Sequence, residues 1–355
     1  MTEKEWMELG YSSGVIEVCE GSKVSFEEVY RDWFRMKRNV IRPQSLDRIE
    51  CTWNRHYSGS CFVKMFVSDI SDSDIINFLN GILVREGRIT YKEFSRILQI
   101  VNNVLVYARD LHYSGVSLHD WEHIKRVIPS DKIDSSVKIE DAVRDKYVQE
   151  LIYEVVHNKI YKVKQNASLC LCMNFYLGLR VGELASLTFD DFDFERNVVR
   201  IYKTESKFYD RDDSCSRVGS MCYRVVDSVK TVHSVREIPL LPQVKRFYWL
   251  IKKNHEDNHY NNNYLAYDGD DVILVRSLDR VLRRLCMLCD IPYFNTHMIR
   301  KTFSTRLHFS GVPTRVISDL LGHSEISTTE NSYILSYGSN YQKIYDYMLG
   351  GLKYE

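Results

Sequence analysis

Residues 167–189, ASLCLCMNFYLGLRVGELASLTF, join a strongly apolar helical pattern to a pair of opposite charges. Arg180 and Glu183 are three positions apart, which places both side chains on one face of a helix, with Leu184 and Leu187 behind them. Such a pair is most often a solvated ion pair on an amphipathic helix. The stretch therefore predicts a helix packed on one side, and the rest of the chain must decide whether the pair has a function.

The sequence from about residue 142 onward alternates between helical and extended patterns. Helical periodicity runs through AVRDKYVQELIYEVVHN and returns in SLDRVLRRLCMLCD, MIRKTFSTRLHFSG and TRVISDLLGHS. Between them, NVVRIYK, YRVVDSVK and REIPLLP are β-branched runs bounded by turn residues, which predict a small antiparallel sheet. We expect one domain over 142–340, a β-hairpin insert near 203–229 and a tail helix over 341–355.

Residues 24–127 form a separate helical pattern. SFEEVYRDWFRMKRN starts at a capping serine, ISDSDIINFLNGILVREG starts with Ser-Asp and ends at a glycine, and YKEFSRILQIVNNVLVYARDL repeats apolar residues every three or four positions. The polar segment 128–141, IPSDKIDSSVKIED, contains a proline and is the predicted linker. Residues 1–23 are a short extension. The predicted fold class is mainly α with a small antiparallel β-sheet.

The composition is that of an ordinary soluble protein. The 355 residues suffice for two domains, and 44% are hydrophobic and 27% charged. The start, MTEKEWMELGYSSG, has no apolar run, and no stretch has the roughly 20 apolar residues of a membrane-spanning helix. Nine cysteines without a secretion signal indicate reduced thiols and a cytoplasmic location. Two close pairs lie within apolar helical patterns and predict buried thiols rather than a metal site: Cys170 and Cys172, and Cys286 and Cys289.

The formal net charge is zero, which counts against a nucleic-acid partner, although the distribution of charge matters more than its total. Basic residues do cluster in FRMKRNVIR and VRSLDRVLRR. A charge run of this kind is usually a solvated face. The candidates for DNA contact within the two clusters are Lys37, Arg38, Arg42, Arg280 and Arg284.

Further motifs follow the opening stretch in a fixed order. VKTVHSVREIPL carries Lys230 before an apolar strand, and THMIRKTFSTRL places His297 and Arg300 three residues apart. LLGHS ends a helix at a glycine before His323, and Tyr333 comes ten residues later. Each motif alone is more simply explained by a solvated side chain. In this order they resemble the tyrosine recombinase family, which includes phage integrases, Xer recombinases and Cre.

The resemblance implies that a tyrosine oxygen attacks a DNA phosphodiester, which builds negative charge on the nonbridging oxygens. Arg180 and Arg300 are then expected to hold these oxygens bidentately. Lys230 is expected to protonate the leaving 5′ oxygen. His297 and His323 are expected to donate hydrogen bonds to the phosphate or to move protons.

The same resemblance assigns Glu183 to the support of Arg180, whose side chain it fixes from behind. The product is a 3′-phosphotyrosine ester, which keeps the bond energy, so that rejoining needs neither ATP nor a metal. This fits a sequence without a P-loop pattern, a two-metal carboxylate cluster or zinc-finger spacing. No cofactor and no metal are therefore predicted.

Tyr333, Tyr337, Tyr341 and Tyr345 recur every fourth residue, and an aromatic stripe at this spacing usually packs in a core. In Xer-like members the nucleophile follows the Gly-His histidine by nine residues, a position that Ser332 occupies here. An offset of ten resembles the integrases of conjugative transposons. We therefore expect Tyr333 to be the nucleophile and Tyr337 to be a packing residue.

The insert TESKFYDRDDSCSRVGSMCY is a second point of similarity to the conjugative-transposon integrases, which carry an extra hairpin at this place. Lys203, in IYKTESK, is an alternative to Lys230, but the sequence after Lys230 fits the pattern Lys-Thr-x-x-Ser-x-Arg-x-Ile-Pro-Leu better. The helical residues 24–127 are similar to the family's core-binding domain. The short extension before them resembles no basic arm-binding domain, so binding to distant arm sites is not expected.

By this resemblance the chain is a site-specific recombinase that integrates or excises a mobile element. Its expected partners are double-stranded DNA recombination sites, further copies of the chain in a tetramer on DNA, and an accessory directionality factor. Its expected location is the cytoplasm, in association with a bacterial nucleoid. The tail YQKIYDYMLGGLKYE docks either on a neighbouring subunit or on its own domain. The alternatives are a type IB topoisomerase-like enzyme and a DNA-binding accessory protein with a dead site.

Overall fold

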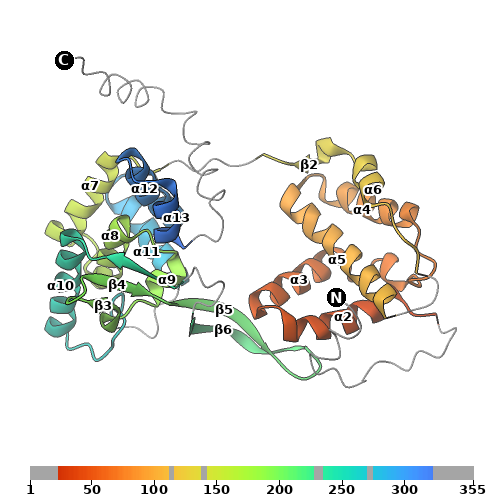
Figure 1. Cartoon of the computed structure of the whole chain (residues 1–355), viewed down its shortest axis with the longest axis horizontal. Coiled ribbons are helices and arrows are strands. Elements are labelled where there is room, and N and C mark those ends of the chain that lie inside the picture. Colours follow the sequence, from red (N-terminus) through yellow and green to blue (C-terminus); the bar gives the residue numbers. More distant parts are fainter. Residues whose placement is uncertain (1–22, 112–115, 137–141, 228–234, 270–274, 323–355) are drawn as a thin grey trace, which may run out of the picture. The chain divides into compact units, whose positions relative to one another are not determined.

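The structure is a computed structural model that describes residues 23–111, 116–136, 142–227, 235–269 and 275–322. The chain divides into two compact units (Figure 1). Unit 1 comprises Met1–Val137 together with Lys207–Cys222, and unit 2 comprises Lys138–Ser206 together with Tyr223–Glu355. Helices dominate both units and the sheets are small, which confirms the predicted fold class.

Unit 1 is built from helices α2 (Phe26–Val40), α3 (Pro43–His56), α4 (Asp72–Glu86), α5 (Tyr91–Asp110) and α6 (Trp121–Val127), with a 3₁₀ turn at Phe62–Lys64. The predicted capping residues do start these helices. Ser25 and Glu28 form a capping box on α2, and Ser71 and Asp74 form one on α4. Gly87, with φ of 73°, ends α4 in a conformation that favours glycine.

The core of unit 1 lies where α2 and α3 pack against α5 (Figure 1). Aromatic rings fill it: Tyr30 and Trp53 stack with centroids 3.5 Å apart. Tyr57 is fully buried and donates its hydroxyl hydrogen to the Ile97 carbonyl oxygen at 2.5 Å. The buried rings thus pack against one another, and the hydroxyl of Tyr57 has an acceptor, whereas the buried hydroxyl of Tyr30 has no hydrogen-bond partner among the described residues.

Part of the predicted linker belongs to unit 1. A 3₁₀ turn at Ser130–Lys132 leads into β2 (Ile133–Asp134), which pairs in parallel with β1 (Ile89–Thr90). The two-residue ladder ties the start of the segment 128–141 to the N-terminus of α5. The boundary between the units falls later in that segment, after Val137.

The hairpin insert is formed by β5 (Lys203–Arg211) and β6 (Arg217–Asp227), and its outer part belongs to unit 1. The Arg211 side chain is 4% exposed and donates to Asp47 at 2.6 Å and to Glu50 at 2.7 Å. Cys215 is buried among the apolar residues of the same unit. The sequence places the whole insert in the C-terminal domain; its tip packs with unit 1 because α3 supplies the carboxylates that a buried guanidinium needs.

Unit 2 is arranged around one buried helix. Its helices are α7 (Asp145–Tyr153), α8 (Gln165–Leu177), α9 (Val181–Ala185), α10 (Pro242–Asp257), α11 (Val275–Leu288), α12 (Thr296–Phe309) and α13 (Thr314–Leu321). Every residue of α8 except Tyr176 is buried, and α10, α11 and α12 pack around it (Figure 1). The apolar residues of α8 face all sides of the helix, as expected for a helix in the centre of a domain, and its buried polar side chains Gln165, Asn166, Ser168 and Asn174 have hydrogen-bond partners.

A three-stranded antiparallel sheet completes unit 2. Its order is β3 (Phe192–Asp193), β4 (Val198–Ile201) and β7 (Arg236–Pro239), and Val199 faces Ile238. Both side chains of that pair are buried in the core of unit 2. The first residue of β7 is Arg236, and α13 packs against this strand.

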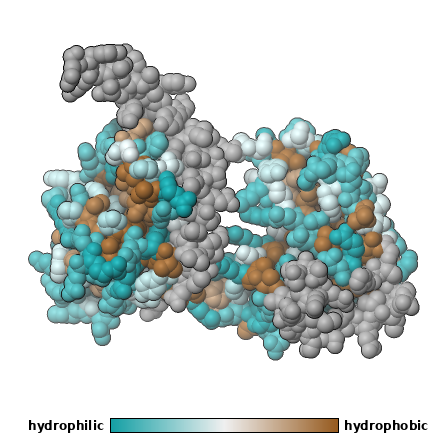
Figure 2. All heavy atoms as spheres, in the orientation of Figure 1, coloured by the Kyte–Doolittle hydropathy of each residue, from teal (hydrophilic) through white to brown (hydrophobic). Residues whose placement is uncertain are grey.

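The surface of the described residues is mainly hydrophilic on the face that Figure 2 shows, with separate hydrophobic patches. Exposed apolar side chains such as Val84 and Val163 are scattered singly over different helices and turns, which is normal for a protein surface. No helix in the described part of the chain has the length and apolar character that crossing a membrane requires.

Candidate active site

The Arg180–Glu183 pair forms at a turn between two helices. α8 ends at Gly178 in the left-handed conformation (φ 63°, ψ 28°), and Arg180 then precedes α9 with an extended backbone. Glu183, in the first turn of α9, accepts from the Arg180 backbone N–H at 2.9 Å and from its Nη1 at 3.0 Å. The Glu183 side chain is 2% exposed and that of Arg180 is 44% exposed, so this is not the solvated pair that the spacing alone suggests.

A third residue, Arg236 of β7, closes on the same carboxylate. Its Nη1 and Nη2 donate to the two Glu183 oxygens at 3.2 and 2.8 Å, and its Nε donates to the Leu320 carbonyl oxygen at 2.6 Å. The site prediction missed Arg236, although the pattern matched after Lys230 contains it. The signal was an arginine inside an apolar strand, a residue type that is almost never buried unless it is paired.

Arg300 brings a second predicted residue to this place from the middle of α12. Its Nη1 donates to the Gly178 carbonyl oxygen at 3.0 Å, and its Nη2 donates to the Leu321 carbonyl oxygen at 2.5 Å. Nη1 also lies 3.9 Å from a Glu183 oxygen. Arg180 donates to the same Leu321 oxygen at 3.3 Å and to Gly322 at 3.0 Å. The two predicted guanidiniums, 120 positions apart in the sequence, thus share one acceptor.

The end of α13 is the acceptor for all three arginines. Leu320, Leu321 and Gly322 each offer a carbonyl oxygen to a guanidinium, and such carbonyls at the end of a helix have no partner within it. Gly322 closes the helix with φ of 65°, as predicted from LLGHS. His323 follows directly in the sequence and lies outside the described residues.

The electrostatics of the cluster favour an anion. Burial by itself would raise the pKa of Glu183, but hydrogen bonds from Arg236 and the charges of the arginines outweigh it and lower the pKa to about 2. Burial lowers the pKa of Arg300, and the neighbouring Arg180 and Arg236 add to this effect. Three guanidiniums and one carboxylate leave a net positive charge among the described residues of the cluster, which a phosphate can compensate.

The other predicted catalytic residues are placed as follows. His297 is exposed near the start of α12, one turn from Arg300. Lys230, His323 and Tyr333 lie outside the described residues. Lys203, the alternative lysine, is held by Asp191 at 2.9 Å and by the Thr188 hydroxyl at 2.6 Å.

The five DNA-contact candidates differ in their surroundings. Arg38 donates to the carbonyl oxygens of Arg211 and Asp212 at 3.2 and 2.6 Å, so its guanidinium holds the tip of the hairpin. Lys37 lies over the Trp33 ring, and burial lowers the pKa of its ammonium group. The remaining three candidates have exposed side chains: Arg42 before α3, and Arg280 and Arg284 on α11.

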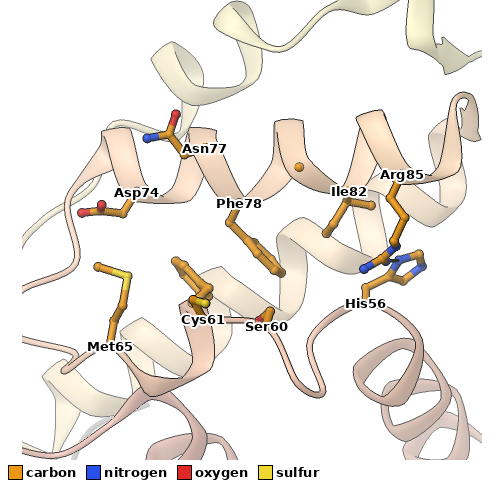
Figure 3. Close-up of a pocket in the computed structure, with 11 residues that line it drawn as sticks. His56, Ser60, Cys61, Met65, Asp74, Asn77, Phe78, Ile82 and Arg85 are labelled. Atoms are coloured by element: carbon orange, nitrogen blue, oxygen red, sulfur yellow. Dashed lines mark hydrogen bonds between the residues drawn. The ribbon is translucent and has the colours of Figure 1, made fainter.

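A cavity of about 370 Å³ in unit 1 is separate from the arginine cluster (Figure 3). Phe78 and Ile82 line it, and Arg85 and His56 lie together at one end (Figure 3). Arg85 is near His56 Nδ1 at 3.2 Å, and Glu93 is near Nε2 at 3.0 Å. Because arginine can only donate, Nδ1 accepts and Nε2 carries the hydrogen. Both ring nitrogens of His56 therefore have protein partners.

The cysteines predicted to be buried are buried. Cys170, Cys172, Cys286 and Cys289 are all less than 9% exposed, and burial raises the pKa of each thiol, that of Cys289 to about 11. Among the residues that the structure describes, no group of three His, Cys, Asp or Glu side chains is arranged to hold a metal ion.

The fold agrees with the comparisons to known proteins. A family model described as the phage integrase family matches residues 143–339, more than half of the chain. The chain therefore belongs to the phage integrase family. It is a tyrosine-type site-specific recombinase, and its similarity to transposon integrases, expected from the spacing of the motifs, is confirmed.

Three relatives illustrate this similarity. A protein named tyrosine recombinase XerC-like, from Caldanaerobacter subterraneus subsp. tengcongensis, is 25% identical over 89% of this chain and 82% of its own length. The Tn1549 transposon integrase, solved in complex with transposon right-end DNA, has a TM-score of 0.65 at 18% identity, over 90% of this chain and 99% of its own. The lambda integrase, solved as a tetramer bound to a Holliday junction, has a TM-score of 0.56 at 13% identity, over 88% of this chain and 78% of its own.

Proposed function

We propose that the chain cleaves and rejoins double-stranded DNA through a 3′-phosphotyrosine ester, with Tyr333 as the nucleophile, and that it integrates or excises a mobile element. The observation that carries the proposal is the meeting of Arg180 and Arg300 at the Leu321 carbonyl oxygen, two residues before His323 in the chain. Two guanidiniums from different helices at one point match the charge of a phosphodiester under attack.

Arg180 and Arg300 have different tasks in this proposal. The Arg180 side chain is 44% exposed, so its remaining N–H groups can reach a phosphate that enters from solvent. The Arg300 side chain is 5% exposed and donates to protein acceptors. It therefore acts on the phosphate mainly through its positive charge, from the buried side of the site. Because both stay charged at working pH, they stabilise the extra negative charge of the transition state more than that of the ground state.

The proton transfers are assigned to the remaining predicted residues. Lys230 protonates the leaving 5′ oxygen, while His297 and His323 hold the phosphate or move protons. The structure supports Lys230 over Lys203 because the Lys203 ammonium group already has Asp191 and Thr188 as partners. Taking one partner out of a buried ion pair of this kind is costly, which keeps the lysine from an incoming strand.

We further propose that the chain acts on recombination sites as a homotetramer in the bacterial cytoplasm, in association with the nucleoid. The lambda integrase tetramer on a Holliday junction and the Tn1549 integrase with transposon DNA support a multimer on duplex DNA. The tail 341–355 docks on a neighbouring subunit, and a directionality factor sets the balance between integration and excision. Arg42, Arg280 and Arg284 are exposed and contact the DNA backbone in this proposal.

The test uses a nicked duplex that carries the junction sequence at the ends of the DNA element encoding the chain. A nick beside the scissile phosphate releases a short strand after cleavage and traps the covalent intermediate. We expect a denaturant-resistant protein–DNA adduct with the native chain and with Tyr337→Phe, and none with Tyr333→Phe. An adduct that survives in Tyr333→Phe would assign the nucleophile to another residue. Binding without an adduct in the native chain would favour a DNA-binding accessory protein.

A further inference from the structure

Arg236 has a different position in the cluster from the two predicted arginines. Its guanidinium is directed edge-on at Glu183, with both terminal nitrogens on the two carboxylate oxygens. Its side chain is 6% exposed, against 44% for Arg180. The Arg180 guanidinium, by contrast, donates to Glu183 through Nη1 alone, and its Nη1 and Nη2 both donate to carbonyl oxygens at the end of α13. Arg236 therefore contacts the support of the site rather than the place where a phosphate enters.

Arg236 contacts, or belongs to, three elements that lie close in the sequence to proposed catalytic residues. Through Glu183 it touches the residue that orients Arg180. Through its Nε it fixes the carbonyl of Leu320, two residues before the helix end at Gly322. It is also the first residue of β7, six positions after Lys230 in the sequence.

We propose that Arg236 is a positioning residue for strand cleavage, which holds Glu183, and through it the Arg180 guanidinium, in register with the end of α13. This inference rests on the proposed function. A planar fork suits the task, because the two hydrogen bonds from Nη1 and Nη2 fix the rotation of the carboxylate and a third, from Nε, fixes the helix end. Lysine keeps the charge but cannot make the three directional bonds.

The expected effect lies in the rate of cleavage and not in DNA binding. Replacing a residue that orients the ligands of a metal site typically lowers activity by about 10- to 100-fold, and we expect an effect of the same size for a residue that orients a catalytic arginine. Since Arg236 is buried and does not face the entry side, the affinity for DNA should change less than threefold. A purely structural role would instead lower the fraction of active protein and leave the rate of the remaining active molecules unchanged.

The experiment compares Arg236→Lys with Arg196→Lys on the nicked duplex described above, at saturating DNA. Arg196 also forms a two-bond fork, with Glu237, but on the surface, with 59% of its side chain exposed. We expect Arg236→Lys to form the adduct about 10- to 100-fold more slowly than the native chain, with the same final amount of adduct and the same affinity. Arg196→Lys should match the native chain in all three.

A second substrate separates the two routes by which Arg236 reaches the site. If sulfur replaces the bridging 5′ oxygen, the leaving thiolate needs no proton, while the charge on the nonbridging oxygens still needs Arg180. The defect of Arg236→Lys should therefore persist on the sulfur substrate. A defect that disappears there would place the effect in proton transfer from the Lys230 segment and overturn the inference.

Three further results decide the remaining cases. A native rate in Arg236→Lys would overturn the inference outright. A lower amount of adduct at a native rate would assign Arg236 to stability alone and overturn the inference, whereas a slower rate with an unchanged final amount of adduct in Arg236→Lys supports it. Absence of an adduct from the native chain and from Arg196→Lys would be a failure of the proposed function and not of the role of Arg236.

Discussion

Glu183 is the residue on which the arginine cluster depends, and Glu183→Gln tests this dependence. Glutamine keeps the shape of the side chain but replaces a carboxylate oxygen by an N–H₂ group. In the native chain, Arg236 and Arg180 donate to both carboxylate oxygens of Glu183. In the variant, at least one N–H of the glutamine would face these guanidinium donors, which have no acceptor to offer it. The substitution therefore leaves buried positive charges facing a donor instead of an acceptor.

The magnitude follows from the electrostatics. The pKa of Glu183 is about 2 in the folded chain, against an ordinary value of 4.5, which corresponds to roughly 3 kcal/mol of stabilisation of the charged form. Breaking one side of a buried ion pair costs about 3–5 kcal/mol in other proteins, in agreement with this figure. We expect unit 2 to lose roughly 3 kcal/mol of unfolding free energy at pH 7.

Hydrogen exchange resolves the two units within one sample. The amides of α8, in the centre of unit 2, should exchange about 100-fold faster in Glu183→Gln, while the amides of α5 in unit 1 serve as the internal standard. Glu237→Gln, which breaks an exposed pair with Arg196, is the matched control and should change α8 less than threefold. Equal rates in α8 of the native chain and Glu183→Gln would refute the reasoning.

The dependence on pH has a defined sign. Because folding lowers the pKa of Glu183, its contribution is present in full above pH 4.5 and is lost as the pH falls towards 2. The difference in urea unfolding free energy between the native chain and Glu183→Gln should stay constant from pH 8 to pH 5 and shrink below that. A difference that already declines between pH 7 and pH 6 would point to a titrating histidine instead.

The remaining predictions concern other contacts. Arg38→Ala should release the hairpin tip and expose the Cys215 thiol, which is 4% exposed, to a thiol reagent, whereas Arg35→Ala, on the surface of the same helix, should not. Gly178→Ala should lower the unfolding free energy of unit 2 by about 2–4 kcal/mol, because the added Cβ would lie 2.3 Å from the Phe303 ring and the backbone has a positive φ. Gly311→Ala is the control: its backbone also has a positive φ but the added Cβ would meet no atom, so the unfolding free energy should fall by only about 1 kcal/mol. Arg280→Ala should reduce the slope of log affinity against log salt by about 0.9, and an unchanged slope would remove Arg280 from the DNA contacts. Lys203→Met should destabilise unit 2 but keep adduct formation, whereas Lys230→Met should lose it on the oxygen substrate and regain it on the sulfur substrate.

Local chemistry made several features of the fold predictable. The capping serines of α2 and α4 and the glycine that ends α13 act within one helical turn, so the sequence window contains the whole interaction. The β-branched runs NVVRIYK and REIPLLP likewise predicted two strands, and β4 and β7 lie within them. The similarity to the recombinases was predictable because it depends on the order of the motifs along the chain and not on any contact between them.

The partners of Arg38 and Arg211 were beyond a sequence pattern. Arg38 belongs to a basic run and was predicted to contact DNA, yet it donates to two backbone carbonyls of the hairpin about 170 positions away. Arg211 was simply part of an insert, yet it is buried against Asp47 and Glu50. A sequence window cannot contain such pairs, because they depend on how the hairpin returns to unit 1.

For the site itself, the sequence by itself determined which residue types are present and in what order: the spacing of Arg180 and Glu183, the glycine before His323 and the family to which they point. Only the tertiary structure decided that Glu183 is buried, that Arg236 joins it, and that Arg180 and Arg300 meet at the end of α13. The physical reason is that desolvation and shared acceptors depend on distance in space. Helices remote in the sequence must pack around α8 before three guanidiniums can share one carboxylate.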